Sequence, residues 1–401
     1  MVPGMSQPTT DVAVVGLGAF GSAVLYQLAR QGLRTIGIDR FAPPHTMGSS
    51  HGETRITRLA VGEGDAYAPL VRRSHALWRE IEHEAQTDLF QETGGLIMAP
   101  RDSSARHHGR ENFVRRSIAM AERTGIAHEV LDASEIAARY PQFQLRGDEL
   151  GYFEPTAGVL SPERCVEAQL RLAQRHGAIV RTNERILAID QQATSVRLTT
   201  DRGTIEAARC IVTAGPWLSS LLPAFRPLAQ VYRQMLHWFA PLDPSAFAPG
   251  RFPVFIWMHG EQEEDYFYGF PIAPGGIDLK VASETYAQPT DPDHQDRTVS
   301  ANDQASMYAQ HVSGRLRDVT ARATRSAACL YTVTPDAGFI IDTLPGQDRV
   351  LAVSACSGHG FKHSAAVGEA IAQRVATGTS VINLAPFAIG RFGGSGTGGP
   401  L

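Results

Sequence analysis

The chain has 401 residues with a net charge of −4, and 43% of them are apolar and 19% charged. This composition is typical of a globular protein long enough for two or three domains. It has no basic excess of the kind that nucleic-acid binding needs, and it lacks a run of about 18 apolar residues, so neither a nucleic-acid-binding protein nor a membrane-spanning one is expected.

The N-terminal region carries the clearest structural pattern. A short apolar strand over 11–15 is followed by a glycine-rich turn, a helical stretch and a second strand over 35–39. The three glycines of the turn are Gly16, Gly18 and Gly21. They allow a tight turn, a close approach to a pyrophosphate and close helix packing, while the helix N-terminus attracts phosphate. Asp39, 18 residues after Gly21, can bind both ribose hydroxyls. The unit predicts a dinucleotide site, which could hold either NAD or FAD.

The rest of the chain does not repeat this unit. Hydrophobic periodicity predicts helices over 67–81, 108–126, 300–318 and 362–376, and strands over 92–99, 210–215, 328–342 and 350–355. A capping signal at Asp132 or Ser134 predicts a helix that stops before Pro141. Residues 230–285 are aromatic and strand-like, and the glycine-rich end of the chain is expected to be disordered. The cofactor fold therefore begins at the N-terminus and closes near 350–376, with a second domain between.

Only two of the 37 basic residues are lysines, Lys280 and Lys362. A genome that favours arginine codons explains the general shortage. These two lysines are nevertheless candidates for a role that needs a compact, titratable ammonium group. The four cysteines form no CxxC pair and are too few for a disulfide framework, so neither a zinc site nor any other metal site is expected. The N-terminus has no basic segment of a secretory signal, and a reducing cytoplasm is expected.

Four sequence blocks carry a family resemblance. They are GLGAFGSA (16–23), PPHTMGSSHGETRITR (43–58), YGFP with LKVASE (268–284), and ACLYTVTPDAGFIID with SACSGHGFKHSAAVGE (328–369). Over residues 10–392 the chain resembles monomeric sarcosine oxidase and N-methyltryptophan oxidase, which are FAD enzymes that oxidise secondary amines. The resemblance implies an α/β (α+β) architecture: a discontinuous Rossmann-like FAD-binding domain and a substrate domain built on a mixed, largely antiparallel sheet. The implied FAD-binding domain comprises 10–86, 152–222 and 326–385, the substrate domain comprises 87–151 and 223–325, and 386–401 form a tail.

The resemblance also assigns roles to single residues. Cys329, otherwise typical of a small core residue, would bond the flavin covalently. Arg55 would lie near the flavin ring, and Arg58 with Lys362 would bind a substrate carboxylate, although two solvated loop arginines are the plainer interpretation. Lys280 would face the flavin and activate dioxygen. Further cofactor contacts are implied for Ser50, His51, Ile186, Gly215, Trp217, Gly358 and Gly360.

The substrate cavity is less defined. Tyr268 and Tyr331 match aromatic residues that line it in these oxidases, or else they are ordinary core residues. Glu284 departs from the family pattern, because the fourth residue after the lysine is His in sarcosine oxidases, whereas fructosyl amino acid oxidases resemble K-x-x-x-E. A glutamate there would favour a substrate with hydroxyl or cationic groups, or would only tune the pocket.

The implied reaction is FAD-dependent oxidation of an N-methyl amino acid by dioxygen, which yields an imine, then formaldehyde, the free amino acid and hydrogen peroxide. The alternatives on the same fold are a fructosyl amino acid oxidase and a cyclic imino acid (pipecolate or proline) oxidase. A nicotinamide dehydrogenase and a non-catalytic flavin sensor belong to other classes. The expected partners are a small amino-acid substrate and dioxygen, with no nucleic acid or membrane, and the protein is expected to be a monomer.

Overall fold

The computed structural model describes residues 10–103, 106–108, 110–344 and 346–393. The glycine-rich end expected to be disordered spans 390–401; this expectation is wrong for 390–392, which belong to a short 3-10 helix over 389–392, and 394–401 lie outside the described ranges. No helix in the described part of the chain combines the length and the apolar character needed to cross a membrane.

The first sheet forms the expected cofactor fold. Its strands are β11 (Ile179–Arg181), β2 (Thr35–Ile38), β1 (Thr10–Val15), β14 (Gly203–Val212), β13 (Val196–Thr200) and β12 (Ile186–Gln191), in that order, with β21 (Gln347–Ser354) beside β14 and β20 (Ile340–Leu344) beside β21. The central strands β11, β2, β1, β14 and β21 run parallel. Along one edge, β14 pairs first with β13 and then with β21, which brings the C-terminal strand next to the N-terminal unit.

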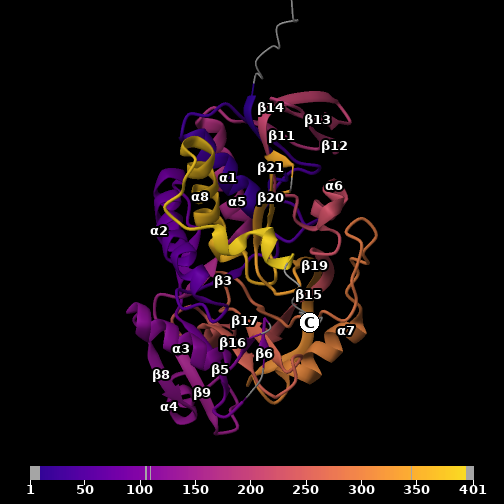
Figure 1. The fold of residues 1–401 in the computed structure, drawn as a ribbon. Helices are drawn as coiled ribbons and strands as arrows, with labels where there is room; N and C mark the ends of the chain where they lie inside the picture. The colour runs from indigo at the N-terminus through magenta and orange to yellow at the C-terminus, as the bar shows by residue number, and fades with distance from the viewer. Residues whose placement is uncertain (1–9, 104–105, 109, 345, 394–401) are drawn as a thin grey trace, which may run out of the picture.

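Helices α1 (Ala19–Arg30) and α5 (Pro162–Arg175) lie against strands of this sheet, α8 (Ser364–Thr377) packs against α1, and α2 (Ala68–Ala85) packs on α5 and α8 (Figure 1). Helix α1 packs between α5 and α8, and its side chains are buried from Ala23 to Ala29. Gly368 of α8 makes the approach close, because a Cβ there would lie 2.7 Å from the Cβ of Ala23. The interrupted cofactor fold expected from the sequence is thus confirmed.

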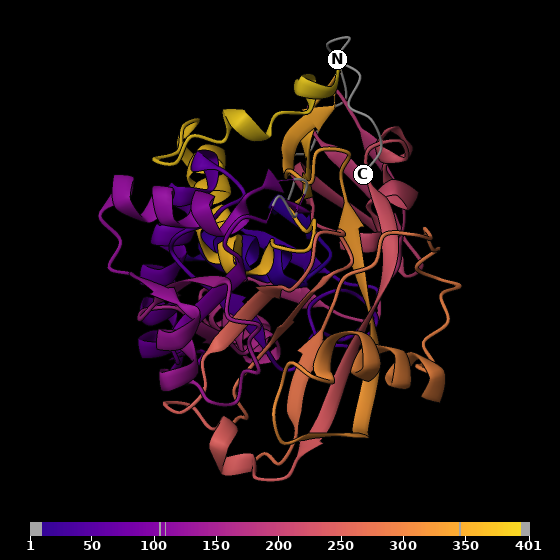
Figure 2. The same cartoon turned by 90° about the horizontal axis from the view of Figure 1, so that it is seen from below.

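The second sheet is mixed and largely antiparallel, as predicted. Its strands are β19 (Val319–Val333), β15 (Gln230–Pro241), β18 (Leu279–Ala282), β17 (Tyr266–Gly269), β16 (Val254–Met258), β5 (Gly95–Pro100), β9 (Glu149–Glu154) and β8 (Glu129–Asp132). Only β5 and β16 pair in parallel. Seen from below, the N-terminal helical layer in indigo and purple and the orange strands of this sheet lie on opposite sides (Figure 2). Residues 152 and 326 lie inside β9 and β19 of this sheet, and domain boundaries at those positions stay a prediction.

Smaller elements complete the structure. They are β3 (Arg55–Thr57), β4 (Phe90–Glu92) and β10 (Gly158–Leu160) in a three-stranded sheet, the hairpin β6 (Arg106–His107) and β7 (Arg110–Glu111), and the helices α3 (Phe113–Thr124), α4 (Ala133–Arg139), α6 (Leu218–Leu221) and α7 (Ala301–Met307). Asp132 caps α4 in a reciprocal capping box with Glu135, and the helix ends before Pro141 as predicted.

Three predicted elements have different bounds. The helix predicted over 108–126 begins only at Phe113, because the hairpin β6–β7 occupies its start. The helix predicted over 300–318 ends at Met307 and continues as one π-helical turn to Val312. The strand predicted over 328–342 is interrupted at 334–339, where the carboxylate of Asp336 accepts the Gly338 N–H and holds a turn.

Candidate active site

A cavity of about 380 Å³ extends from the glycine turn after β1 to the second sheet. Most of the predicted site residues line it: Gly16, Gly18, Asp39, Ser50, Arg55, Arg58, Ile186, Gly215, Trp217, Tyr268, Lys280, Glu284, Tyr331, Gly358, Gly360 and Lys362. Gly21, His51 and Cys329 lie behind this lining. The fold therefore gathers into one cavity residues that are hundreds of positions apart in the chain.

The end of the cavity at β1 has the features of a dinucleotide site. Gly16 has a φ of +87°, and a Cβ on Gly21 would lie 1.7 Å from the Gly16 carbonyl oxygen, so the turn and the start of α1 require glycine at both positions. Gly18 caps α1 without a side-chain hydrogen bond, which leaves N–H groups at the helix start for an anion. The Asp39 carboxylate accepts the backbone N–H of Leu17 at 2.7 Å and lies at the cavity wall.

Cys329 lies on β19 and is 1% exposed. Its Sγ is 3.8 Å from the carbonyl oxygen of Ser49 and 4.0 Å from that of Gly48, and both of these residues line the cavity. Burial raises the pKa of the thiol, but neighbouring His51 and Arg55 more than offset this effect and bring the pKa down to about 7. A thiol with a lowered pKa is readily converted to the nucleophilic thiolate.

Two cations, Arg55 and Lys280, are fixed by the loop between β2 and β3. The Arg55 guanidinium donates to the carbonyl oxygens of Ser49 at 2.6 Å and His51 at 2.8 Å. Lys280 Nζ donates to the Thr54 hydroxyl at 2.8 Å and lies 4.7 Å from the ring centre of Phe270. Burial and the charge of Arg55 hold the pKa of Lys280 well below its usual value. Both groups are oriented by backbone carbonyls and a hydroxyl, and neither is hydrogen-bonded to a carboxylate.

The two residues assigned to the substrate carboxylate also meet in the cavity. Arg58 Nη2 and Lys362 Nζ lie 3.1 and 3.2 Å from Oε1 of the same residue, Glu63. All three side chains are at most 6% exposed. Burial raises the pKa of Glu63, but Arg58 and Lys362 outweigh it and hold the pKa well below the ordinary value. Burial lowers the pKa of Lys362 to about 8, despite the charge of Glu63.

Sequence reasoning missed Glu63. Its only signal is a single acid between two glycines, five residues after Arg58 in GETRITRLAVGEG. A buried acid next to two predicted cations would be the expected counter-charge.

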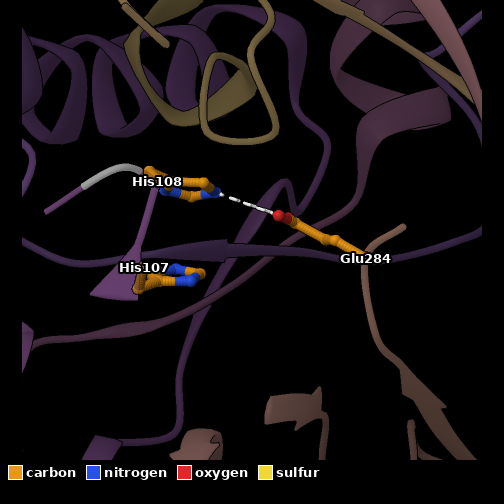
Figure 3. Close-up of side chains that lie close together, drawn as sticks. All are labelled: His107, His108 and Glu284. Atoms are coloured by element: carbon orange, nitrogen blue, oxygen red, sulfur yellow. Dashed lines mark hydrogen bonds and ion pairs between the residues drawn. The ribbon is translucent and has the colours of Figure 1, made fainter. Parts of the chain in front are cut away.

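Glu284 lines the cavity and is paired with His108, a residue that the sequence did not point to (Figure 3). His108 Nε2 is 3.3 Å from Glu284 Oε2, and the Tyr286 hydroxyl donates to the same oxygen. Burial raises the pKa of Glu284, but His108 outweighs it and the pKa falls to about 2. Burial lowers the pKa of His108, but Glu284 outweighs it and the pKa rises to about 9. The pair is therefore ionic at neutral pH.

His107 lies beside His108, and its burial and the neighbouring charge keep its pKa well below 6.5, so it is neutral. One ligand atom each from His107, His108 and Glu284 lie within 4.8 Å of one another, a set that could hold a metal ion. The His108 Nε2–Glu284 Oε2 distance of 3.3 Å and the opposite charges of the two groups describe an ion pair.

The hydroxyls of Tyr268 and Tyr331 lie 3.2 Å apart at the cavity wall. Tyr268 is on β17 and Tyr331 on β19, so the pair bridges strands that are not neighbours in the second sheet. Both residues line the cavity, as expected, and their hydroxyl groups are partners of each other.

The sequence profile of the family described as FAD dependent oxidoreductase matches residues 11–374 of the chain. The chain belongs to this family. It is 37% identical to monomeric sarcosine oxidase of Bacillus sp. (strain B-0618), over 95% of this chain and 96% of that one. It is 31% identical to N-methyl-L-tryptophan oxidase of Salmonella dublin, over 95% and 99%.

Solved structures of this FAD-dependent oxidoreductase fold agree with the architecture. NikD, an amino acid oxidase essential for nikkomycin biosynthesis, superposes with a TM-score of 0.81 at 22% identity, over 95% of this chain and 98% of that one. Fructosyl amine:oxygen oxidoreductase from Aspergillus fumigatus superposes with a TM-score of 0.71 at 18% identity, over 94% and 88%. At these identities the likeness concerns the fold.

The cavity of this FAD-dependent oxidoreductase fits its cofactor. Three buried hydroxyls at the wall, those of Ser49, Thr332 and Ser354, have no hydrogen-bond partner within the described part of the protein. A buried polar atom without a partner is costly, and a polar ligand such as FAD would satisfy it. The glycine turn would hold the pyrophosphate and Asp39 the ribose.

Proposed function

We propose that the protein oxidises N-methyl amino acids at the carbon–nitrogen bond, with dioxygen as the electron acceptor. The amine loses two electrons and two protons to give an imine, water hydrolyses the imine to formaldehyde and the free amino acid, and dioxygen is reduced to hydrogen peroxide. Bound FAD supplies the two-electron acceptor for this chemistry. The identity to sarcosine and N-methyltryptophan oxidases over almost the whole chain supports this substrate class.

One observation carries the proposal: Arg58 and Lys362, from opposite ends of the chain, converge on one point of the cavity. A planar guanidinium and an ammonium suit a carboxylate, and they would fix an amino acid by this group. The reacting carbon would then be held at a constant distance from Arg58 and Lys362. The Arg55 guanidinium, and Lys280 in its protonated form, would stabilise negative charge that develops beside them, on the reduced cofactor and on dioxygen as it is reduced.

Cys329 is proposed as the covalent attachment site of the flavin. Its lowered pKa and its position directly behind Gly48 and Ser49 support this role. The four cysteines are free, which supports the cytoplasm as the compartment, and the protein is proposed to act there as a monomer.

The fructosyl amino acid alternative relied on Glu284. The carboxylate of Glu284 already binds His108 and the Tyr286 hydroxyl, so few of its lone pairs are left for a sugar. An N-methyl substrate is therefore favoured over a fructosyl one.

The decisive experiment is anaerobic bleaching of the flavin absorbance by a panel of amino acids: sarcosine, N-methyltryptophan, pipecolate, proline and fructosyl-glycine. Rapid bleaching by sarcosine or N-methyltryptophan, with formaldehyde and peroxide formed in air, is expected. Bleaching by fructosyl-glycine alone, or by no amine at all, would overturn the proposal.

A further inference from the structure

Three cationic groups surround a single oxygen in the cavity. Arg58 Nη2, Lys362 Nζ and His108 Nδ1 lie 3.1, 3.2 and 3.8 Å from Glu63 Oε1. The first two contacts are hydrogen bonds, whereas the third, from His108 Nδ1, is too long for one. His108 Nδ1 accordingly has no hydrogen-bond partner, although its side chain is only 6% exposed. A buried, charged donor without an acceptor is costly and indicates a ligand that completes it.

The orientation of the His108 ring is fixed through its other nitrogen, Nε2. Its Nε2 binds Glu284, which in turn accepts the Tyr286 hydroxyl, so the ring is oriented with Nδ1 toward Glu63. His359, from the C-terminal segment, also packs against the His108 ring. Its Nε2 is hydrogen-bonded to the Ala337 carbonyl oxygen, and burial lowers its pKa to about 3. His107 from β6 is likewise neutral. Neither neighbour supplies the missing acceptor.

The charges of this cluster leave one unit of positive charge. Arg58, Lys362 and His108 carry three positive charges, and Glu63 and Glu284 carry two negative ones. A buried cluster with a net charge is unfavourable, and one added carboxylate would neutralise it. The substrate carboxylate of the proposed reaction has this charge, and it would enter beside Arg58 and Lys362.

We propose that His108 is a third substrate-binding residue, which donates from Nδ1 to the substrate carboxylate, and that Glu284 is the positioning residue that keeps His108 protonated and oriented. The inference rests on the proposed function and deepens it. It gives Glu284 a role that requires no contact with the substrate side chain. The hydrogen bond from His108 would also favour substrates with a free carboxylate over the corresponding amides and esters.

The test is a binding titration of the FAD-loaded enzyme, followed by the flavin absorbance. The probe is methoxyacetate, in which an ether oxygen replaces the amine of sarcosine and blocks oxidation, and methoxyacetamide is its uncharged partner. The variants are His108→Asn and Glu284→Gln, and His83→Asn on the exposed face of α2 is the matched control.

His108→Asn should weaken methoxyacetate binding by about 10-fold or more at pH 7 and leave methoxyacetamide unchanged, because a charge-assisted hydrogen bond is lost. In the wild type, affinity for methoxyacetate should fall as pH rises through about 8 to 9, because both Lys362 and His108 lose their protons in this range. The fall should involve one proton fewer in His108→Asn, and in Glu284→Gln it should begin at lower pH, because the charge that raises the pKa of His108 is removed. A purely structural role of either residue would not change this pH profile.

Equal affinities of the wild type and His108→Asn for methoxyacetate would overturn this inference, as would equal losses for the acid and the amide. A pH profile of Glu284→Gln that is the same as that of the wild type would exclude Glu284 from the positioning role. The proposed function fails separately, if no N-methyl amino acid reduces the flavin of the wild type. The two failures are therefore distinguishable in one set of samples.

Discussion

Lys362 Nζ lies 3.2 Å from Glu63 Oε1, although the two residues are 299 positions apart in the chain. Glu63 follows β3, near the N-terminus, and Lys362 lies in the short helical turn before α8. The contact joins the two ends of the interrupted cofactor fold at the substrate side of the cavity. Loss of this contact should weaken substrate binding more than it slows the chemical step.

Lys362→Ala is expected to raise KM for sarcosine by about 10- to 100-fold, because a buried charge-assisted hydrogen bond to the carboxylate is lost. In the wild type the same binding should weaken as pH rises through about 8, since the ammonium loses its proton there. Steady-state kinetics from pH 6 to 10 measure both effects. An unchanged KM, or a loss of binding through about pH 8 that is the same in the variant as in the wild type, would exclude Lys362 from carboxylate binding.

Lys280→Met is expected to slow flavin reoxidation by dioxygen about 100-fold or more, while anaerobic reduction by substrate changes little. The methionine keeps the length of the side chain and removes the charge that would stabilise reduced oxygen. Stopped-flow measurement of the two half-reactions separates these effects. Equal losses in both would assign Lys280 to general packing near Phe270 and Trp238.

Cys329→Ala is expected to release FAD on acid precipitation, whereas the wild type should keep its yellow colour in the pellet. Cys356→Ala is the matched control, since burial raises the pKa of Cys356 and makes it a poor nucleophile. Covalent loading of wild-type apoprotein should accelerate as pH rises through about 7, where the Cys329 thiol becomes a thiolate. Release of all flavin from the wild type would contradict the tether.

Gly21→Ala is expected to lower the stability of the protein by about 1–3 kcal/mol and to weaken FAD binding, because the new methyl group overlaps the Gly16 carbonyl oxygen. Gly390→Ala, which meets no atom within 4 Å, is the control. Thermal unfolding with and without added FAD measures both. A Gly21→Ala variant as stable as the control would show that the turn can relax.

The dinucleotide unit was predictable because its determinants are local. The spacing from Gly16 to Asp39 fixes strand, turn and helix without reference to the rest of the chain, and the structure confirms each of them. The strand over 210–215 was also recognisable, since its small and apolar residues fit the centre of a parallel sheet.

The charge partners were not predictable in the same way. Glu63 and His108 contact Lys362 and Glu284 over sequence separations of 299 and 176 residues, and no spacing rule covers such pairs. An acid or a histidine in a loop is usually solvated, so composition gave no reason to select these two. The start of β19 at Val319 was missed for a related reason: its first half is polar and half-exposed, and it is ordered by pairing with β15.

The position of β21 and α8 also affects the order of events in biosynthesis. Helix α1 has its apolar surface covered on one side by α8, and β14 has part of its edge covered by β21, so the N-terminal unit remains incomplete until residues 347–377 have been translated. In a nascent chain, the apolar surface of α1 and the edge of β14 would remain exposed during most of translation. Cofactor capture is thus expected to be post-translational, and truncation after β19 should yield an apoprotein prone to aggregation rather than a smaller flavoprotein.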